Sequence, residues 1–138
     1  MMFFIDTSIF VDVLRKKTVS SSKRLFDSIL ESNEGFISSI TVAELSVGAH
    51  LSPRQDAIEK TLELLSLVSV INLDHKIAFR GGEIYSELVR RGLEIELNDC
   101  LIAATCLSAG ISEIVTRNVN HFDRIGGVDA IIPENLGF

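Results

Sequence analysis

Residues 2–8 read Met-Phe-Phe-Ile-Asp-Thr-Ser, an apolar run that ends at an acid followed by two hydroxyl side chains. An unbroken apolar run of this kind is typical of a strand buried on both faces, as the strands of a parallel sheet are. Beyond Asp6 the apolar residues change to helical spacing, at Ile9, Phe10, Val13 and Leu14. The chain is therefore expected to pass from a buried strand to a helix at Asp6.

The alternation of strand and helix continues along the chain. Further strands are expected at 35–38, 68–73, 113–116 and 130–132. Further helices are expected after possible N-caps at Ser20, Ser21 and Ser22, and then at 40–51, 53–67, 76–91 and 98–110. The helix at 53–67 is expected to have its apolar face at Ile58, Leu62 and Leu65. Strands that alternate with helices indicate an α/β fold with a mainly parallel sheet. A chain of 138 residues has the length of one domain, and we expect residues 1–138 to form it.

The composition is that of a globular protein with an excess of apolar character. Hydrophobic residues make up 46% of the chain and charged residues 23%. The mean hydropathy of +0.32 is nevertheless high for a small monomer. We interpret the excess as an apolar interface and expect a homodimer, because subunit interfaces are more hydrophobic than ordinary surface.

The two cysteines indicate a reducing compartment. Cys100 and Cys106 lie on different faces of one expected helix, and no Cys-x-x-Cys or paired His accompanies them. They are therefore expected to form neither a disulfide nor a zinc site. The first residues do not resemble a signal peptide, and no apolar run is long enough to span a membrane. We expect a cytoplasmic protein that does not enter a membrane.

The net charge of −6 at first disfavours nucleic acid as a partner, since nucleic-acid binders usually carry a basic surface. That argument fails if divalent cations bridge the protein to phosphate, because such a site requires a cluster of acids. Basic residues that could contact a phosphate backbone remain at Arg15-Lys16-Lys17, Lys23-Arg24, Arg90-Arg91 and Arg117. Taken singly, each of these is also compatible with a solvated helix end.

Three acids occupy positions where a ligand could bind. Ligands of parallel sheets bind beyond the carboxyl ends of the strands, and Asp6 ends the first strand. Glu44 shares one face of its expected helix with Ile40, Val47 and Leu51, so its carboxylate lies on an apolar stripe where burial without a partner is costly. Asp99 heads an almost wholly apolar helix.

Each acid also has a purely structural interpretation. Asp6 could cap the helix that begins at Thr7. Glu44 could lie at the edge of its stripe and reach solvent. Asp99 could cap its helix or be a first-turn charge favoured by the helix dipole, although Asn98 alone could supply the cap.

A fourth polar segment, Thr116-Arg117-Asn118, follows the strand expected at 113–116, with His121 and Asp123 close behind. His121 is expected to be a surface or packing residue and not a metal ligand. The four segments together resemble the motifs of the PIN-domain family, in the family's order, and above all those of its VapC-type toxins. The matching stretches are Phe4-Ile5-Asp6-Thr7-Ser8, Thr41-Val42-Ala43-Glu44-Leu45, Asn98-Asp99-Cys100-Leu101-Ile102-Ala103-Ala104 and Val115-Thr116-Arg117-Asn118.

The resemblance implies a five-stranded parallel sheet between helices and an acidic pocket that holds Mg²⁺, or Mn²⁺, for endonucleolytic cleavage of RNA. It also implies a homodimer and a cognate antitoxin that plugs the pocket, which we expect to insert an Arg or Lys among the carboxylates. Asp6 and Asp99 are expected as principal metal ligands, with Glu44 binding through water or orienting the nucleophile. Ser8 and Thr116 could supply supporting hydroxyls.

One residue departs from the family pattern. The family often has an acid at the position of Asn118, and an amide can bind a metal through its carbonyl oxygen but adds no charge. Asn118 therefore favours a site with one metal ion over a site with two, although Asp123 or Glu96 could supply the missing carboxylate. It also favours an alternative, a non-catalytic binding module. A phosphatase or phosphoacceptor domain is disfavoured by Ser8, which stands where an Asp-x-Asp phosphatase needs its second acid, and by the lack of a Lys beside Arg117.

Overall fold

The computed structural model describes every residue from Met1 to Phe138 and contains a five-stranded, wholly parallel sheet. The strand order is β3-β2-β1-β4-β5. The strands are β1 (Met2–Ile5), β2 (Glu34–Ser38), β3 (Ser69–Ile71), β4 (Glu113–Val115) and β5 (Asp129–Ile131). The expected α/β class and parallel sheet are confirmed, with each strand within a few residues of its predicted bounds.

β1 is the central strand and the point at which the chain changes direction across the sheet. The chain adds β2 and then β3 on one side of β1, and β4 and β5 on the other. The register pairs Ile5 with Val115, and the Asp6 N–H donates to the Val115 carbonyl at 2.9 Å. The residues that follow β1 and β4 therefore lie side by side at a topological switch point, where ligands of such sheets bind.

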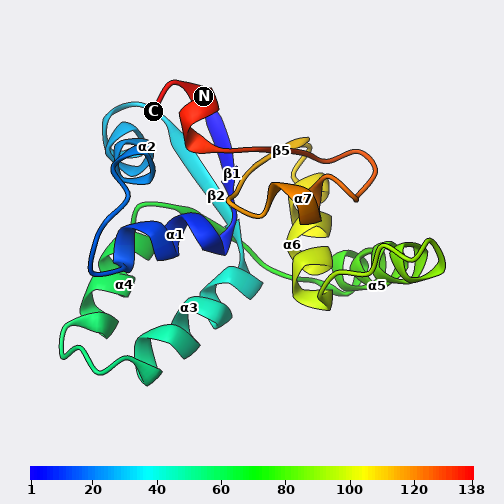
Figure 1. The fold of residues 1–138 in the computed structure, drawn as a ribbon, viewed down its shortest axis with the longest axis horizontal. Helices are drawn as coiled ribbons and strands as arrows, with labels where there is room; N and C mark the ends of the chain where they lie inside the picture. Colours follow the sequence, from blue (N-terminus) through cyan, green and yellow to red (C-terminus); the bar gives the residue numbers. More distant parts are fainter.

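Helices cover both faces of the sheet (Figure 1). They are α1 (Thr7–Leu14), α2 (Ser20–Glu31), α3 (Ser39–Leu51), α4 (Ala57–Leu65), α5 (His75–Arg90), α6 (Leu97–Ser108) and α7 (Val119–Phe122), with a 3₁₀ turn, η1 (Pro133–Leu136). Alternate residues of β1 point to opposite faces: Phe4 packs in the core formed with α5, α6 and α7, whereas Phe3 and Ile5 pack in the core formed with α1 to α4. None of these helices is long and apolar enough to pass through a membrane.

The predicted apolar faces of α3 and α4 are wrong. α3 buries Thr41 and Leu45, while Val47 and Leu51 are 60% and 80% exposed. The buried residues of α4 are Thr61 and Leu64, and the predicted core residues Ile58 and Leu62 lie outside, at 45% and 61% exposure. Both helices carry apolar residues on more than one face, so the hydrophobic pattern alone does not identify the face that packs.

Two predicted helix starts are also wrong. α2 is capped by the backbone of Val19, without a side-chain bond, and its serines lie inside the first turn, where Ser21 and Ser22 are buried. α6 begins at Leu97 after Glu96, so neither Asn98 nor Asp99 is its N-cap. Asp99 instead lies in the first turn, with its side chain 16% exposed.

Candidate active site

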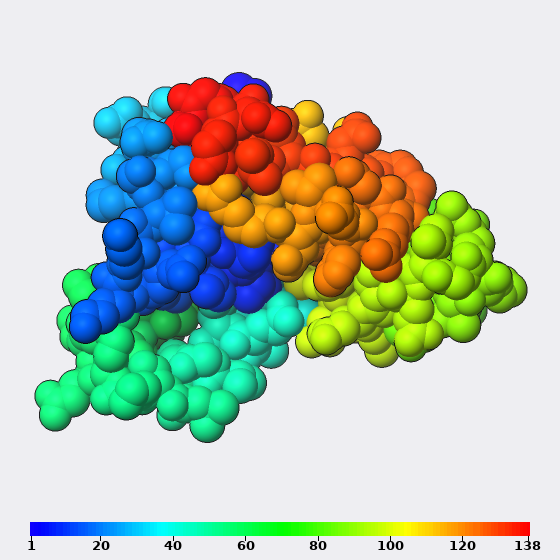
Figure 2. All heavy atoms as spheres, in the orientation of Figure 1, coloured from blue at the N-terminus to red at the C-terminus, as the bar shows by residue number.

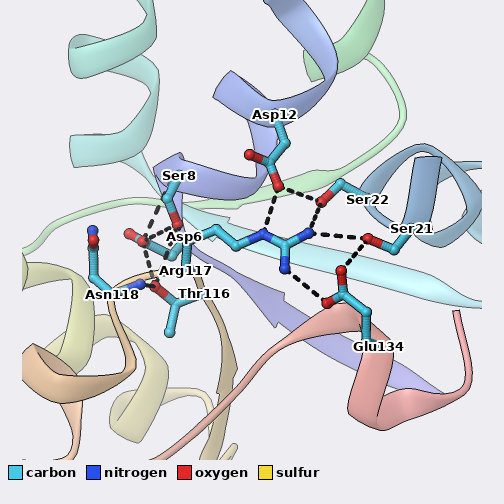
Figure 3. Close-up of polar contacts among 9 residues, drawn as sticks. All are labelled: Asp6, Ser8, Asp12, Ser21, Ser22, Thr116, Arg117, Asn118 and Glu134. Carbon is cyan, nitrogen blue, oxygen red and sulfur yellow. Dashed lines mark hydrogen bonds and ion pairs between the residues drawn. The ribbon is translucent and has the colours of Figure 1, made fainter. Parts of the chain in front are cut away.

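Asp6 lies at the carboxyl end of β1 and is 2% exposed. Its Oδ2 atom accepts hydrogen bonds from the hydroxyls of Ser8 and Thr116, both at 2.7 Å, and a longer one from the Ser8 N–H at 3.4 Å. Asp6 is thus the N-cap of α1, as its structural interpretation predicts, but it is also fixed by a hydroxyl from β4 (Figure 3). All these bonds go to Oδ2, which leaves Oδ1 free to bind a ligand.

Glu44 is half-buried on α3 and faces the first turn of α1. Its Oε1 accepts a hydrogen bond from the Thr7 hydroxyl at 2.7 Å, and the same hydroxyl lies 2.9 Å from Thr41 Oγ1. The buried apolar stripe on which sequence reasoning placed Glu44 does not exist, because Val47 and Leu51 are exposed. Glu44 is oriented by Thr7, the residue next to Asp6, whose role the sequence did not reveal.

Asp99 shows that the three carboxylates influence one another. Its pKa is raised from 3.8 to about 6, mainly by burial and then by the nearby negative charges of Asp6 and Glu44, while His121 acts in the opposite direction. His121 Nδ1 lies 3.6 Å from Asp99 Oδ2, so this histidine, expected to be an unremarkable surface or packing residue, belongs to the site's surroundings. The structure thus brings Asp6, Glu44 and Asp99 to one region from β1, α3 and α6.

The oxygen donors of the site suit a hard divalent cation, but they do not surround it with protein ligands alone. No three His, Cys, Asp or Glu side chains stand close enough to surround a metal ion. Mg²⁺, however, is usually held by one or two carboxylates and keeps several waters. The free Oδ1 of Asp6 and the partly exposed carboxylate of Asp99 fit such a site.

Asn118 and its neighbours complete the rim of the site. The Asn118 N–H donates to Thr116 Oγ1 at 2.9 Å, while its exposed side chain makes no capping bond to α7. Asp123 accepts from the Ala130 N–H and is engaged with β5, so it does not replace the missing acid. Glu96 is exposed and acts on the site only by raising the pKa of Asp99.

Arg117 is not free to contact a phosphate backbone, contrary to the sequence interpretation. Its guanidinium is bonded to Asp12, Glu134 and two serines of α2. The Arg117 guanidinium lowers the pKa of the Glu134 carboxyl to about 2 through their hydrogen bond. Both cysteines are buried and unpaired, as expected.

A cavity of about 240 Å³ opens beside Glu44, between α1, α3 and α4. Its wall includes Thr7 and Glu44 at one end, the apolar side chains of Val11, Leu14 and Leu45, and the basic residues Arg15, Arg54 and Lys60. The site is therefore continuous with a partly apolar groove that could receive a segment of another protein.

The chain matches known proteins over nearly its whole length. Residues 3–128 match the family described as the PIN domain. The chain is 33% identical to Ribonuclease VapC2 of Rickettsia felis, over 91% of this chain and 92% of that protein. It is 32% identical to the tRNA(fMet)-specific endonuclease VapC of Shigella flexneri, over 91% and 93%.

Solved structures agree with the sequence comparison. The chain resembles a chain of VapBC2 from Rickettsia felis bound to a DNA fragment from its promoter, with a TM-score of 0.82, 30% identity and coverage of 96% and 98%. It also resembles a chain of FitAcB from Neisseria gonorrhoeae, with a TM-score of 0.78, 28% identity and coverage of 97% and 99%. This protein therefore belongs to the PIN-domain family, and VapC ribonucleases are among its relatives there.

Proposed function

We propose that this protein is a divalent-metal-dependent endoribonuclease and the toxin of a toxin–antitoxin pair. The observation that carries the proposal is the convergence of Asp6, Glu44 and Asp99 beyond the carboxyl ends of the central strands, expressed in the raised pKa of Asp99. Carboxylates gathered in this way repel one another without a cation. The ribonuclease names of the relatives support RNA as the substrate.

Mg²⁺, or Mn²⁺, would supply Lewis-acid activation of water and of the phosphodiester when bound. Asp6, through Oδ1, and Asp99 are the residues we assign to hold it, with Glu44 acting through a water or orienting the attacking water. Ser8 and Thr116 keep the Asp6 carboxylate in one orientation through their bonds to Oδ2. Asn118 offers a neutral amide oxygen at the rim of the site.

The principal alternative is a binding module that has lost catalysis. Asn118 and the lack of a tightly closed ligand cluster favour it. A phosphatase or phosphoacceptor domain is disfavoured, because Ser8 uses its hydroxyl to hold Asp6 and Arg117 is bonded away from the strand end.

We infer that a small cognate antitoxin blocks the site by placing an Arg or Lys among the carboxylates. The cavity that joins Glu44 to the apolar residues of α1 and α3 supports this inference, since a partner segment lying there would reach the acids. The VapBC complexes among the similar structures support the same kind of partner. We further infer a cytoplasmic homodimer, which the two reduced cysteines and the exposed apolar residues support.

The test of catalysis compares Asp6→Asn, Glu44→Gln and Asp99→Asn with the parent protein. Cleavage of a mixed RNA pool in Mg²⁺ is expected to be lost in all three and retained in Asp27→Asn, which changes an exposed acid on α2 away from the site. Thermal melts establish that each variant is folded. Cleavage that persists in Asp6→Asn or Asp99→Asn, on protein free of contaminating nuclease, would refute the assignment.

The test of the partner is co-expression with the small protein encoded beside this chain. The two are expected to co-purify, and cleavage by the complex is expected to be suppressed. An isolated chain that is not toxic to cells, together with a neighbouring small protein that does not bind it, would contradict the toxin role.

A further inference from the structure

The side chain of Arg117 is held on all sides by groups that lie outside the carboxylate cluster. Nε donates to Asp12 Oδ2 at 2.6 Å and Nη1 to Glu134 Oε2 at 2.7 Å. Nη2 donates to Ser21 Oγ at 3.0 Å and to Ser22 Oγ at 3.1 Å. Figure 3 shows the guanidinium enclosed by these four residues. Since all three nitrogens are bonded, the plane of the guanidinium is fixed in both position and orientation.

The partners of Arg117 are themselves connected. Ser22 donates to Asp12 Oδ2 and Ser21 to Glu134 Oε1, both at 2.7 Å. They come from α1, α2 and η1, and the space-filling view shows the C-terminal segment packed over α2 (Figure 2). We call Asp12, Ser21, Ser22, Arg117 and Glu134 the arginine clamp. Glu134 lies in η1, close to the C-terminus, so the clamp ties the last turn of the chain to the segment that follows β4.

The backbone of Arg117 connects the clamp to Asp6. The Arg117 N–H donates to Ser8 Oγ at 2.9 Å, and Ser8 Oγ donates to Asp6 Oδ2 at 2.7 Å. Thr116, the preceding residue, supplies the other hydroxyl on Asp6 Oδ2. Both side chains that hold the Asp6 carboxylate therefore depend on where the backbone at 116–117 lies.

We propose that Arg117 and Glu134 are positioning residues that fix the Asp6 carboxylate through the Arg117 backbone and the hydroxyls of Ser8 and Thr116. The clamp holds the guanidinium, the guanidinium holds the backbone after β4, and that backbone holds Ser8 in the orientation that donates to Asp6. The C-terminal turn η1 thereby becomes part of the support of the site. The proposal rests on the proposed function in one respect, the role of the Asp6 carboxylate as a metal ligand.

A purely structural clamp would behave differently. If Arg117 only joined α1, α2 and η1, its loss would lower the melting temperature and leave the geometry around Asp6 unchanged. A positioning role requires a local effect at the Arg117 amide and at Asp6 that exceeds any change in global stability. Mutation of a group that orients a ligating side chain typically changes metal affinity or activity about 10- to 100-fold.

The experiment compares Glu134→Ala and Glu134→Gln with a matched control, Glu83→Ala. Glu83 forms an ion pair with Arg80 on α5, and its side chain is 52% exposed compared with 44% for Glu134. The control therefore removes a similar arginine–glutamate pair in α5, outside the clamp and its links to Asp6. Three quantities are measured on the full chain: amide hydrogen exchange of Arg117 without metal, the dissociation constant for Mn²⁺ without RNA, and kcat and KM for RNA cleavage.

Glu134→Ala is expected to increase Arg117 amide exchange about tenfold, to weaken Mn²⁺ binding about tenfold and to lower kcat with little change in KM. Glu134→Gln, which keeps an acceptor oxygen, is expected to recover most of each effect. Glu83→Ala should leave all three at the parent values. A Glu134→Ala variant whose exchange at Arg117 and affinity for Mn²⁺ both stay within twofold of the parent would overturn the proposal, whatever its melting temperature.

Arg117→Lys provides a second test, because a single ammonium cannot satisfy the four acceptors of the clamp. Arg117→Lys is expected to increase amide hydrogen exchange at residue 117 at least as much as Glu134→Ala does. If the parent itself cleaves no RNA, the proposed function fails, while amide exchange and Mn²⁺ binding still decide whether the clamp positions Asp6.

Discussion

The Asp99 carboxyl makes the stability of the metal-free protein depend on pH. Its pKa rises from 3.8 to about 6 on folding, so the folded protein binds the proton more tightly than the unfolded chain. Stability therefore falls as the pH rises from about 4 to about 6. The cost above pH 6 is on the order of 1–2 kcal/mol after solvent screening is allowed for.

Asp99→Asn is accordingly expected to raise the melting temperature in EDTA at pH 7.5 and to lose this advantage near pH 4. In Mg²⁺ the parent should have the higher melting temperature, since the cation stabilises the parent more than the variant. Thermal melts across this pH range, with and without EDTA, measure both effects. An advantage of equal size at pH 4 and pH 7.5 would show that Asp99 is not strained by its neighbours.

Asn118 offers a test of how many charges the site uses. Asn118→Asp adds a carboxylate next to Thr116, whose hydroxyl holds Asp6. A unit charge near a cation at a protein surface contributes on the order of 1 kcal/mol, so Mn²⁺ should bind several-fold more tightly. Asn120→Asp adds the same charge to an exposed position of α7 and is the control. Equal affinities for the two variants would place residue 118 outside the metal site.

The principal acids of the candidate site could be predicted from the sequence, whereas its supports could not. Asp6 and Asp99 stand out because each interrupts or heads an apolar segment. Asp12, Ser21, Ser22 and Glu134 have no such signal, since each alone resembles an ordinary polar surface residue. Their role depends on Arg117, which lies 95 to 105 positions from the partners in α1 and α2 and 17 positions from Glu134.

At the scale of the elements, the packing of α5 against α6 depends on one glycine. A Cβ built on Gly81 would lie 2.5 Å from Leu101 Cδ2 and 3.3 Å from Leu101 Cα, whereas at Gly82 it would meet nothing within 4 Å. Both residues lie in α5, so replacement by Ala improves helix propensity equally, by about 1 kcal/mol. Only Gly81→Ala also places a methyl group against Leu101 of α6, which must shift to admit it.

Gly82→Ala is therefore expected to stabilise the protein by about 1 kcal/mol. Gly81→Ala should destabilise it, because overpacking costs about 1–3 kcal/mol and exceeds the gain in propensity. Urea unfolding of the two variants measures the difference. Since α6 carries Asp99, Gly81→Ala should also weaken Mn²⁺ binding, whereas Gly82→Ala should not. Two variants of equal stability would show that Leu101 moves aside without cost.

The order and type of the elements could be predicted because apolar runs and helical spacing alternate clearly along the chain. The packing faces of α3 and α4 could not, since residues such as Val47 and Leu62 extend the apolar pattern onto faces that the monomer leaves exposed. The start of α2 was missed for a different reason. Its serines have the composition of caps, but they lie inside the first turn, and Ser21 and Ser22 use their hydroxyls to bond Arg117.

At the scale of the whole molecule, the exposed apolar residues favour self-association. Val47 and Leu51 lie one turn apart on α3 and are 60% and 80% exposed. Sedimentation at micromolar concentration is expected to give a species of twice the 15.2 kDa chain mass. Val47→Ser combined with Leu51→Ser should shift it toward the monomer, while Leu30→Ser, at an exposed position of α2, should not. A parent that sediments only as a monomer would contradict the homodimer.

The strand order has a consequence for the synthesis of the protein. β1 is the first strand to leave the ribosome, yet one of its two neighbours in the sheet is β4, and Asp6 meets the Thr116 hydroxyl across 110 positions of chain. A nascent chain thus carries Asp6 long before it carries β4, whose following residue Thr116 fixes the Asp6 carboxylate, and the clamp residue Glu134 emerges later still. An enzyme proposed to cut RNA is therefore expected to stay inactive beside its own messenger until translation is nearly finished. That delay gives an inhibitor made nearby time to bind.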